Sequence, residues 1–253
     1  MLPTCFRTTI CTSSRFTSCV LISQTTSLAP ALAAVLVATT ALAGPSWDLD
    51  LTDDAKQGAN SAQVVSTSGV VTTITGSLGS SPLLGAPDLV DMFLIRIANP
   101  TSLKLSTAGG QFGGSAEFNS QLYLFRADGI LGSLKAFGLL SNNDAESENT
   151  GSLLRNFAND GSGFVLDTPG LYFVAISAYG AFPTTNLGDP IWGQLAPGVV
   201  GFGQQRELID WSTPQQSAGG TYSIRLDGVT GVPSPGALAL LGLSGLIGRR
   251  RSR

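Results

Sequence analysis

Short runs of alternating hydrophobic and polar residues recur through the middle of the chain, and no segment between residues 48 and 230 sustains an apolar period of 3.6 residues. A period of two is typical of half-buried β-strands. The pattern predicts strands over residues 70–75, 92–97, 103–105, 121–126, 171–176 and 222–227.

The order of side chains within these runs predicts which face of each strand is buried. In residues 92–97 the apolar face carries Phe93, Ile95 and Ile97. In residues 222–227 the inward residues are Tyr222, Ile224 and Leu226. Residues 171–176 are apolar on both faces, which indicates a central strand.

Turn residues separate the runs, among them the pairs Asn99-Pro100 and Asp128-Gly129. Seven or eight short strands divided by such turns predict an all-β fold in which two sheets pack as a sandwich. The glycines around Phe112 (109–110 and 113–114) are followed by no phosphate-binding motif, so we expect a flexible loop there.

The N-terminus has the pattern of an export signal. An apolar run over residues 27–43 ends in Ala41-Leu42-Ala43, basic residues precede it, and acidic residues begin at Asp48. A basic region, an apolar core and an Ala-x-Ala site form a signal peptide. We therefore expect a signal helix in residues 1–43, which signal peptidase removes by cutting at the site formed by Ala41 and Ala43, and a folded domain over 44–230.

The C-terminus has the pattern of a short membrane stop. Residues 231–253 contain Val232, Pro233, Ser234 and Pro235, then 13 uncharged, mostly apolar residues. The chain closes with Arg249, Arg250, Arg251 and Arg253. A 13-residue helix spans roughly 20 Å, so a membrane crossing needs neighbouring residues and the snorkelling arginines. Because arginines stay on the cytoplasmic side, we expect the domain to face outward.

This tail resembles the PEP-CTERM sorting signal, which consists of a proline box, a short apolar helix and an arginine-rich end. The resemblance implies recognition by an exosortase-like membrane protease in bacteria that make exopolysaccharide. Ser234 stands where the family usually has Glu. The alternative is an ordinary tail anchor.

Residues 50–229 resemble the bacterial pre-peptidase C-terminal (PPC) type of domain. The resemblance rests on the order of the blocks 54–63, 71–76, 91–95, 118–125, 128–129, 142–144, 169–176 and 220–224. It implies a jelly-roll-like antiparallel β-sandwich, a type of module often attached to secreted enzymes.

The charge and the rare residue types exclude several functions. Residues 44–232 carry 8 basic and 17 acidic side chains, a balance that does not suit nucleic-acid binding. The chain has no His, and its Cys residues (Cys5, Cys11 and Cys19) all precede the expected cleavage site. A catalytic triad, a thiol nucleophile and the usual zinc or haem ligands are therefore excluded from the exported part, and we predict no catalytic residues.

Acidic and amide side chains offer two alternatives. Asp128, Asn142, Asn143 and Asp144, with Glu146 and Glu148, could supply the oxygens that Ca²⁺ requires if two loops meet. Such residues also cap their own backbone in turns. The pairs Asp88/Asp91 and Glu207/Asp210 are the candidates for glycoside hydrolysis, or else ordinary solvated acids.

Strand signals fade between residues 180 and 219, a segment that contains Trp192 and Trp211. Loops of this length tend to be functional or disordered. The two indoles either stack on sugar rings or cover an open end of the sandwich.

These features predict a non-enzymatic exported protein of the cell envelope or extracellular matrix, sorted by its tail and associated with exopolysaccharide. The alternative is a carbohydrate- or calcium-dependent binding module, and a hydrolase is a third hypothesis. No cofactor other than calcium is expected.

Overall fold

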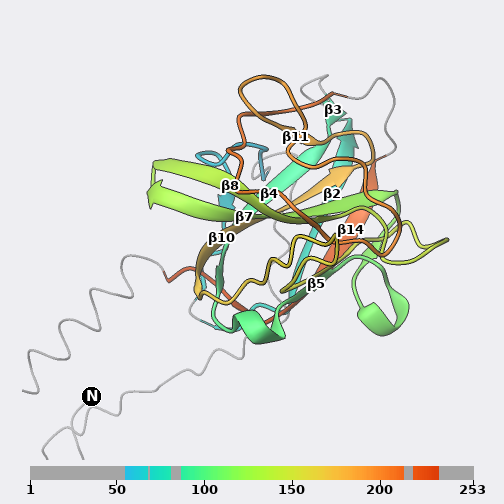
Figure 1. Ribbon diagram of the computed structural model, residues 1–253. Coiled ribbons are helices and arrows are strands. Elements are labelled where there is room, and N and C mark those ends of the chain that lie inside the picture. The colour runs from blue at the N-terminus through green and yellow to red at the C-terminus, as the bar shows by residue number, and fades with distance from the viewer. Residues whose placement is uncertain (1–54, 68, 81–86, 214–218, 234–253) are drawn as a thin grey trace, which may run out of the picture. The chain divides into compact units, whose positions relative to one another are not determined.

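Figure 1 shows the computed structural model of the chain, which describes residues 55–67, 69–80, 87–213 and 219–233. Over these residues the fold is all β, with fifteen strands, two short 3-10 helices (η1, Pro100–Ser102, and η2, Gly110–Phe112) and no α-helix. The expected signal helix and C-terminal apolar helix lie outside the described residues.

The larger sheet has seven strands, and β10 (Gly170–Ala178) lies between β4 and β7. The strand order is β1 (Gln63–Val64), β4 (Val90–Ile97), β10, β7 (Ser120–Ile130), β8 (Ser133–Asn142) and β12 (Gly201–Phe202), with β15 (Val229–Thr230) also pairing with β4. All of these ladders are antiparallel except that between β1 and β4, which is parallel. The sheet is therefore mixed, whereas the sequence predicted an antiparallel one.

The second sheet has six strands. Its order is β3 (Pro87–Asp88), β2 (Thr73–Ser80), β14 (Gly220–Asp227), β5 (Lys104–Ser106) and β9 (Leu153–Arg155), with β6 (Ser115–Ala116) also on β14. A separate two-stranded ladder joins β11 (Pro183–Thr184) to β13 (Asp210–Trp211).

The two large sheets enclose one apolar core, as in a β-sandwich. The larger sheet contributes Phe93, Ile95, Ile97, Leu122, Leu124, Val174 and Ile176. The smaller sheet contributes Ile74, Leu78, Leu105, Leu154, Tyr222, Ile224 and Leu226. The predicted inward faces of β4 and β14 are thus confirmed. Strand β10 is central and buried on both faces, as predicted.

A second apolar cluster covers the opposite, outer face of the seven-stranded sheet. The sheet side chains in it are Met92, Leu94, Tyr123, Phe125, Phe173 and Ala175. The segment after β10 covers them with Ile191, Trp192, Leu208 and Trp211. The two tryptophans therefore cover a sheet face, and the expectation that they close an open end of the sandwich is wrong. Strands that are apolar on both faces require a layer on each side.

The β7–β8 hairpin differs from the sequence prediction. Asp128 and Gly129 do not form the turn, because they pair with Lys135 and Leu134 inside the ladder. The strands continue to the pair Ile130–Ser133, so the turn is at residues 131–132, three residues farther along the chain. Since β10 pairs with β7 only up to Arg126, the end of the hairpin extends beyond its neighbour (Figure 1).

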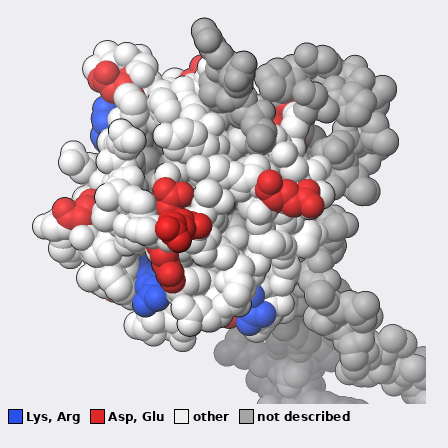
Figure 2. All heavy atoms as spheres, turned by 90° about the vertical axis from the view of Figure 1, so that its right-hand side faces the viewer, with Lys and Arg blue, Asp and Glu red and all other residues white. Residues whose placement is uncertain are grey.

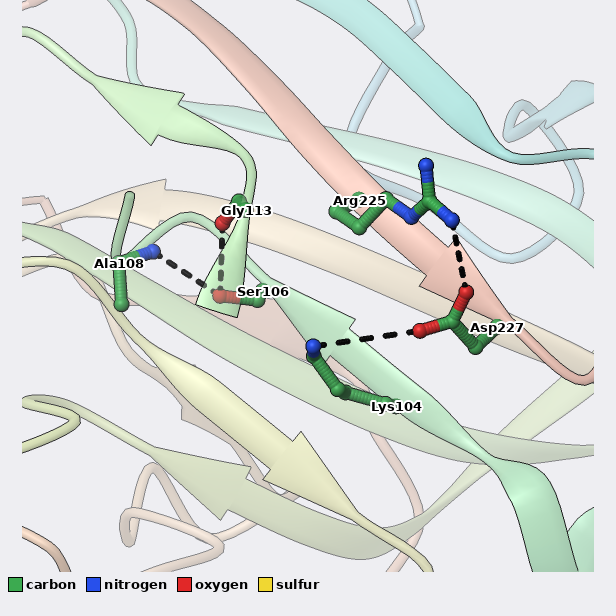
Figure 3. Close-up of polar contacts among 6 residues, drawn as sticks. All are labelled: Lys104, Ser106, Ala108, Gly113, Arg225 and Asp227. Atoms are coloured by element: carbon green, nitrogen blue, oxygen red, sulfur yellow. Dashed lines mark hydrogen bonds and ion pairs between the residues drawn. The ribbon is translucent and has the colours of Figure 1, made fainter. Parts of the chain in front are cut away.

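The glycine-rich segment after β5 is fixed by hydrogen bonds, which corrects the expectation of a flexible loop. The Ser106 hydroxyl donates to the carbonyl of Gly113 at 3.0 Å and accepts from the amide of Ala108 at 3.1 Å (Figure 3). Gly114 has a φ of 74°, and a Cβ there would lie 2.0 Å from the Ser106 carbonyl oxygen. Only glycine allows this approach.

The same region carries two surface ion pairs, one within β14 and one between β14 and β5. Asp227 of β14 contacts Arg225 at 3.1 Å and Lys104 of β5 at 4.0 Å (Figure 3). These side chains are partly exposed, so the pairs contribute little to stability.

The folded domain extends past Thr230, where the sequence placed its end. The Gly231 amide donates to the Gly69 carbonyl at 3.1 Å, and the Val232 amide donates to the Val65 carbonyl at 2.8 Å. The Val232 side chain is buried in the outer apolar cluster. The first residue of the predicted proline box therefore belongs to the domain.

Candidate functional site

A pocket of about 460 Å³ opens in the outer layer of the larger sheet. Its floor comes from β7 and β8, and its walls come from the segment that follows β10. The residues that line it include Gln121, Tyr123, Asn143, Tyr179, Phe182 and Trp192. The volume lies within the range of small-ligand sites.

Strand register explains why the side-chain amides of Gln121 and Asn143 both lie at the floor of the pocket. Leu122 pairs with Asn142, and Tyr123 pairs with Ser141. Side chains alternate between the faces of a sheet, so Gln121 and Asn143, which flank the Leu122–Asn142 pair, project from the same outer face.

Trp192 forms a rigid wall of the pocket. A Cβ on Gly138 or Gly203 would lie 2.9 Å or 2.7 Å from its six-membered ring, so the indole occupies space that only glycines leave open. The ring packs on Tyr123 and Phe125 at centroid distances of 5.4 and 5.6 Å. Its Nε1 donates to the Gly201 carbonyl at 3.1 Å, so this donor is already used.

Tyr123 supports the floor and stays protonated. Burial raises the pKa of its phenol, and a hydrogen bond with Ser177 offsets only part of that rise. Its hydroxyl donates to the Ala181 carbonyl at 3.4 Å. Two aromatic lining residues, Tyr179 and Phe182, have exposed fractions of 52% and 38%, so a ligand can reach them.

Two buried acceptors belong to residues that line this pocket. Gln121 Oε1 and Asn143 Oδ1 have no hydrogen-bond partner among the described residues. The Asn143 Nδ2 donates to Asp144 Oδ2 at 2.6 Å, which fixes the orientation of that amide. Burial raises the pKa of the Asp144 carboxyl, and the bond from Asn143 offsets part of the rise.

The structure does not bring the predicted calcium ligands together. Asp128 pairs with Lys135, whereas Asn142 pairs with Leu122, six residues away along β7. Six residues of a strand span roughly 20 Å, so the expected convergence of Asp128 with Asn142, Asn143 and Asp144 is wrong. Asp128 instead lies 3.8 Å from Arg126.

Asn142 serves the backbone. Its Nδ2 donates to the carbonyls of Asp144 and Val199, and its Oδ1 accepts from the Leu153 amide at 2.7 Å. This is the capping role that the sequence left open as the alternative. Glu146 and Glu148 are exposed, and no group of three or more acidic, His or Cys side chains within the described ranges could hold a metal ion.

Three of the candidate hydrolase carboxylates make other contacts in the structure. Asp91 is fully buried and accepts a hydrogen bond from the Tyr222 hydroxyl, which links the two sheets. Glu207 forms an ion pair with Lys135 at 3.0 Å, and the Asp210 carboxylate accepts from the Trp211 amide at 2.9 Å.

Sequence reasoning located part of the pocket and missed the rest. The sequence indicated Trp192 as a residue that could stack on a sugar ring and Asn143 as a calcium ligand. It did not indicate Gln121 or Tyr179. Trp211, the other candidate aromatic, is buried under the layer, where its Nε1 donates to the Gln57 carbonyl at 2.8 Å. The polar Gln121 at the start of an apolar strand was the available signal.

The predicted processing residues cannot be placed. Ala41, Ala43, Ser234, Pro235 and the arginines Arg249, Arg250, Arg251 and Arg253 lie outside the described residues. Within the described part of the chain, none of the helices is long and apolar enough to cross a membrane.

The described surface is weakly charged. On the face in Figure 2 the carboxylates form separate groups with few cations, and uncharged surface lies between them. No protein-family model, curated protein or solved structure matches the chain.

Proposed function

We propose that this protein is exported and held in the cell envelope or extracellular matrix, where its domain binds exopolysaccharide without catalysing a reaction. The observation that carries the proposal is the uncharged pocket, in which exposed aromatic rings lie beside two buried amide acceptors. Such pockets orient a ligand by a few polar groups among apolar walls.

The sequence of the two ends supports export. Residues 1–43 act as a signal peptide, and the tail acts as a PEP-CTERM-type sorting signal that an exosortase-like protease reads. The proposal also includes a jelly-roll relationship to the PPC domain, in keeping with the sandwich of two large sheets.

The test is fractionation of the producing cells combined with intact mass and binding to the cells' own exopolysaccharide. We expect a mature N-terminus at Gly44, recovery with the envelope or matrix, and retention on immobilised exopolysaccharide. A chain lacking residues 234–253 should bind the polymer equally well but escape into the medium. The truncation begins at 234 because Val232 is part of the folded domain. Full-length, unprocessed protein in the cytosol, or no retention on the polymer, would contradict the proposal.

A further inference from the structure

The geometry points to a neutral saccharide as the ligand of the pocket, held by the Gln121 amide and the rings of Tyr179 and Phe182. This inference rests on the proposed function and specifies its binding site. It assigns the site to the outer face of the larger sheet, away from the calcium and carboxylate candidates.

The polar groups of the pocket require a ligand that donates hydrogen bonds. Gln121 Oε1 and Asn143 Oδ1 are buried acceptors without a partner in the described chain. A ligand donor that satisfies a buried acceptor removes the cost of leaving that acceptor without a hydrogen bond. Both oxygens are buried, and the bond to Asp144 holds the Asn143 amide in place. The Gln121 amide, whose terminal torsion is soft, is therefore the one that turns toward a ligand. A sugar presents several hydroxyl donors on one ring.

Two donors of the pocket are already committed, and the acceptor chemistry of the pocket argues against a proline-rich peptide. The Trp192 Nε1 bonds Gly201, and the Tyr123 hydroxyl bonds Ala181. Aromatic grooves that hold proline-rich segments in an extended helix are a known mode of recognition. However, proline lacks the N–H that the Gln121 acceptor requires.

The walls and the charge of the pocket fit a neutral ring. Tyr179 and Phe182 are exposed in its lining and can contact the apolar C–H face of a sugar. The pocket lining in the described structure consists of uncharged residues only. A uronate or phosphate would lose its hydration there without gaining a cation. Binding should therefore be insensitive to salt.

The test measures binding of full-length protein, purified in mild detergent, by calorimetry and tryptophan fluorescence. The probes are neutral oligosaccharides released from the producer's own exopolysaccharide and defined tetraoses of glucose, galactose, mannose and N-acetylglucosamine. A tetra-uronate and a decaproline peptide serve as comparators. We expect at least one neutral probe to bind, to change the fluorescence of the pocket indole, and to bind equally at low and high salt.

Two variants locate the binding site. Tyr179→Ala removes an exposed ring, and Gln121→Leu replaces an amide of similar size by an apolar side chain. Each should weaken binding of the neutral probe by about tenfold or more, equivalent to about 1.4 kcal/mol. Leu187→Ala, in the same covering segment and 78% exposed, is the control and should bind as the wild type does.

Three results would overturn the inference: no neutral probe binds, the uronate or the peptide binds more tightly, or both pocket variants keep full affinity. If the protein is nevertheless retained on native exopolysaccharide, only the pocket assignment fails. Loss of that retention as well would reject the proposed function itself.

Discussion

Three glycines determine where the Trp192 ring can lie. A Cβ on Gly138 would lie 2.6 Å from the Ile191 Cγ2 and 2.9 Å from the indole, while Gly201 and Gly203 leave room for the same ring. Gly138→Ala should therefore overpack the layer. We expect a loss of about 1–3 kcal/mol in the free energy of unfolding, measured in urea, with weaker ligand binding.

Gly193→Ala is the matched control for this change. A Cβ on Gly193 meets no atom within 4 Å, and its backbone is compatible with alanine. Its free energy of unfolding should therefore match or slightly exceed that of the wild type. Equal stability of Gly138→Ala and the wild type would mean that the space left by the missing Cβ of Gly138 does not constrain Trp192.

Asp160 connects the loop before β10 to the edge strand β12. Its carboxylate accepts from the amides of Ser162 at 2.9 Å and Phe202 at 2.7 Å. Burial alone would raise the pKa of Asp160, but the hydrogen bonds outweigh it and lower the pKa. Because the pKa is lower in the folded state, the carboxylate stabilises the fold at pH values above its usual, unfolded-state pKa. This contribution disappears as the pH falls through the folded-state pKa.

Asp160→Ala should consequently destabilise the protein at pH 7 and much less at pH 3. Because this carboxylate is mostly exposed, we expect about 1 kcal/mol at pH 7, which lowers the Tm by about 2–4 °C. Thermal melts of both proteins from pH 7 to pH 3 measure the difference. Asp128→Ala, which loses only an exposed pair with Arg126, is the control. A difference that does not depend on pH would rule out the carboxylate as its source.

At the scale of elements, Trp211 packs its own segment on the larger sheet and binds the segment that contains Gln57. Its ring packs on Tyr123 at 5.4 Å and on Phe125 at 6.3 Å, and its Nε1 reaches the Gln57 carbonyl. Trp211→Ala should lose about 3–5 kcal/mol in denaturant unfolding. Trp211→Phe keeps most of the ring contact and should lose clearly less. Similar losses in both variants would assign the effect to the hydrogen bond.

The strands that the sequence predicted well are those with unbroken alternation, such as β4 and β14. Strand β8 was missed because its pattern changes in the middle. A register shift opposite Leu124 and Phe125 leaves Leu139 as an extra residue, so Leu139 and Leu140 both enter the inner core. A bulge of this kind interrupts the period of two.

The pocket was only partly predictable for a related reason. Gln121 and Asn143 are brought together by strand register, which depends on where the β7–β8 turn lies. The sequence placed that turn at Asp128-Gly129, three residues too early. Trp211 was recognised as unusual, yet its burial depends on contacts with residues more than 80 positions away.

At the scale of the whole domain, the two apolar clusters share the strands of one sheet. Met92 and Leu94 of β4 face outward, while Phe93 and Ile95 face the inner core. Loss of either layer should therefore weaken the same strands. We expect one cooperative unfolding transition, with coincident curves by tryptophan fluorescence and far-UV circular dichroism.

Leu226→Ala in the inner core and Trp211→Ala in the outer layer should each move this transition as a whole. An outer layer that melts first, seen as an early fluorescence change with unaltered dichroism, would show that the covering segment is a separate unit.

The arginines at the end of the chain lead to a prediction about the orientation of the whole molecule in the membrane. If they hold the tail on the cytoplasmic side, replacing Arg249, Arg250, Arg251 and Arg253 together by Gln removes the barrier to their passage through the membrane. We expect the domain to be released into the medium, measured by fractionation and by protease digestion of spheroplasts. Replacement of the same four residues by Lys keeps the charge and should leave the protein in the envelope. Because Val232 is anchored in the domain, neither change should alter the Tm of the folded part. If the Gln variant fractionates as the Lys variant does, charge at the C-terminus does not retain this protein.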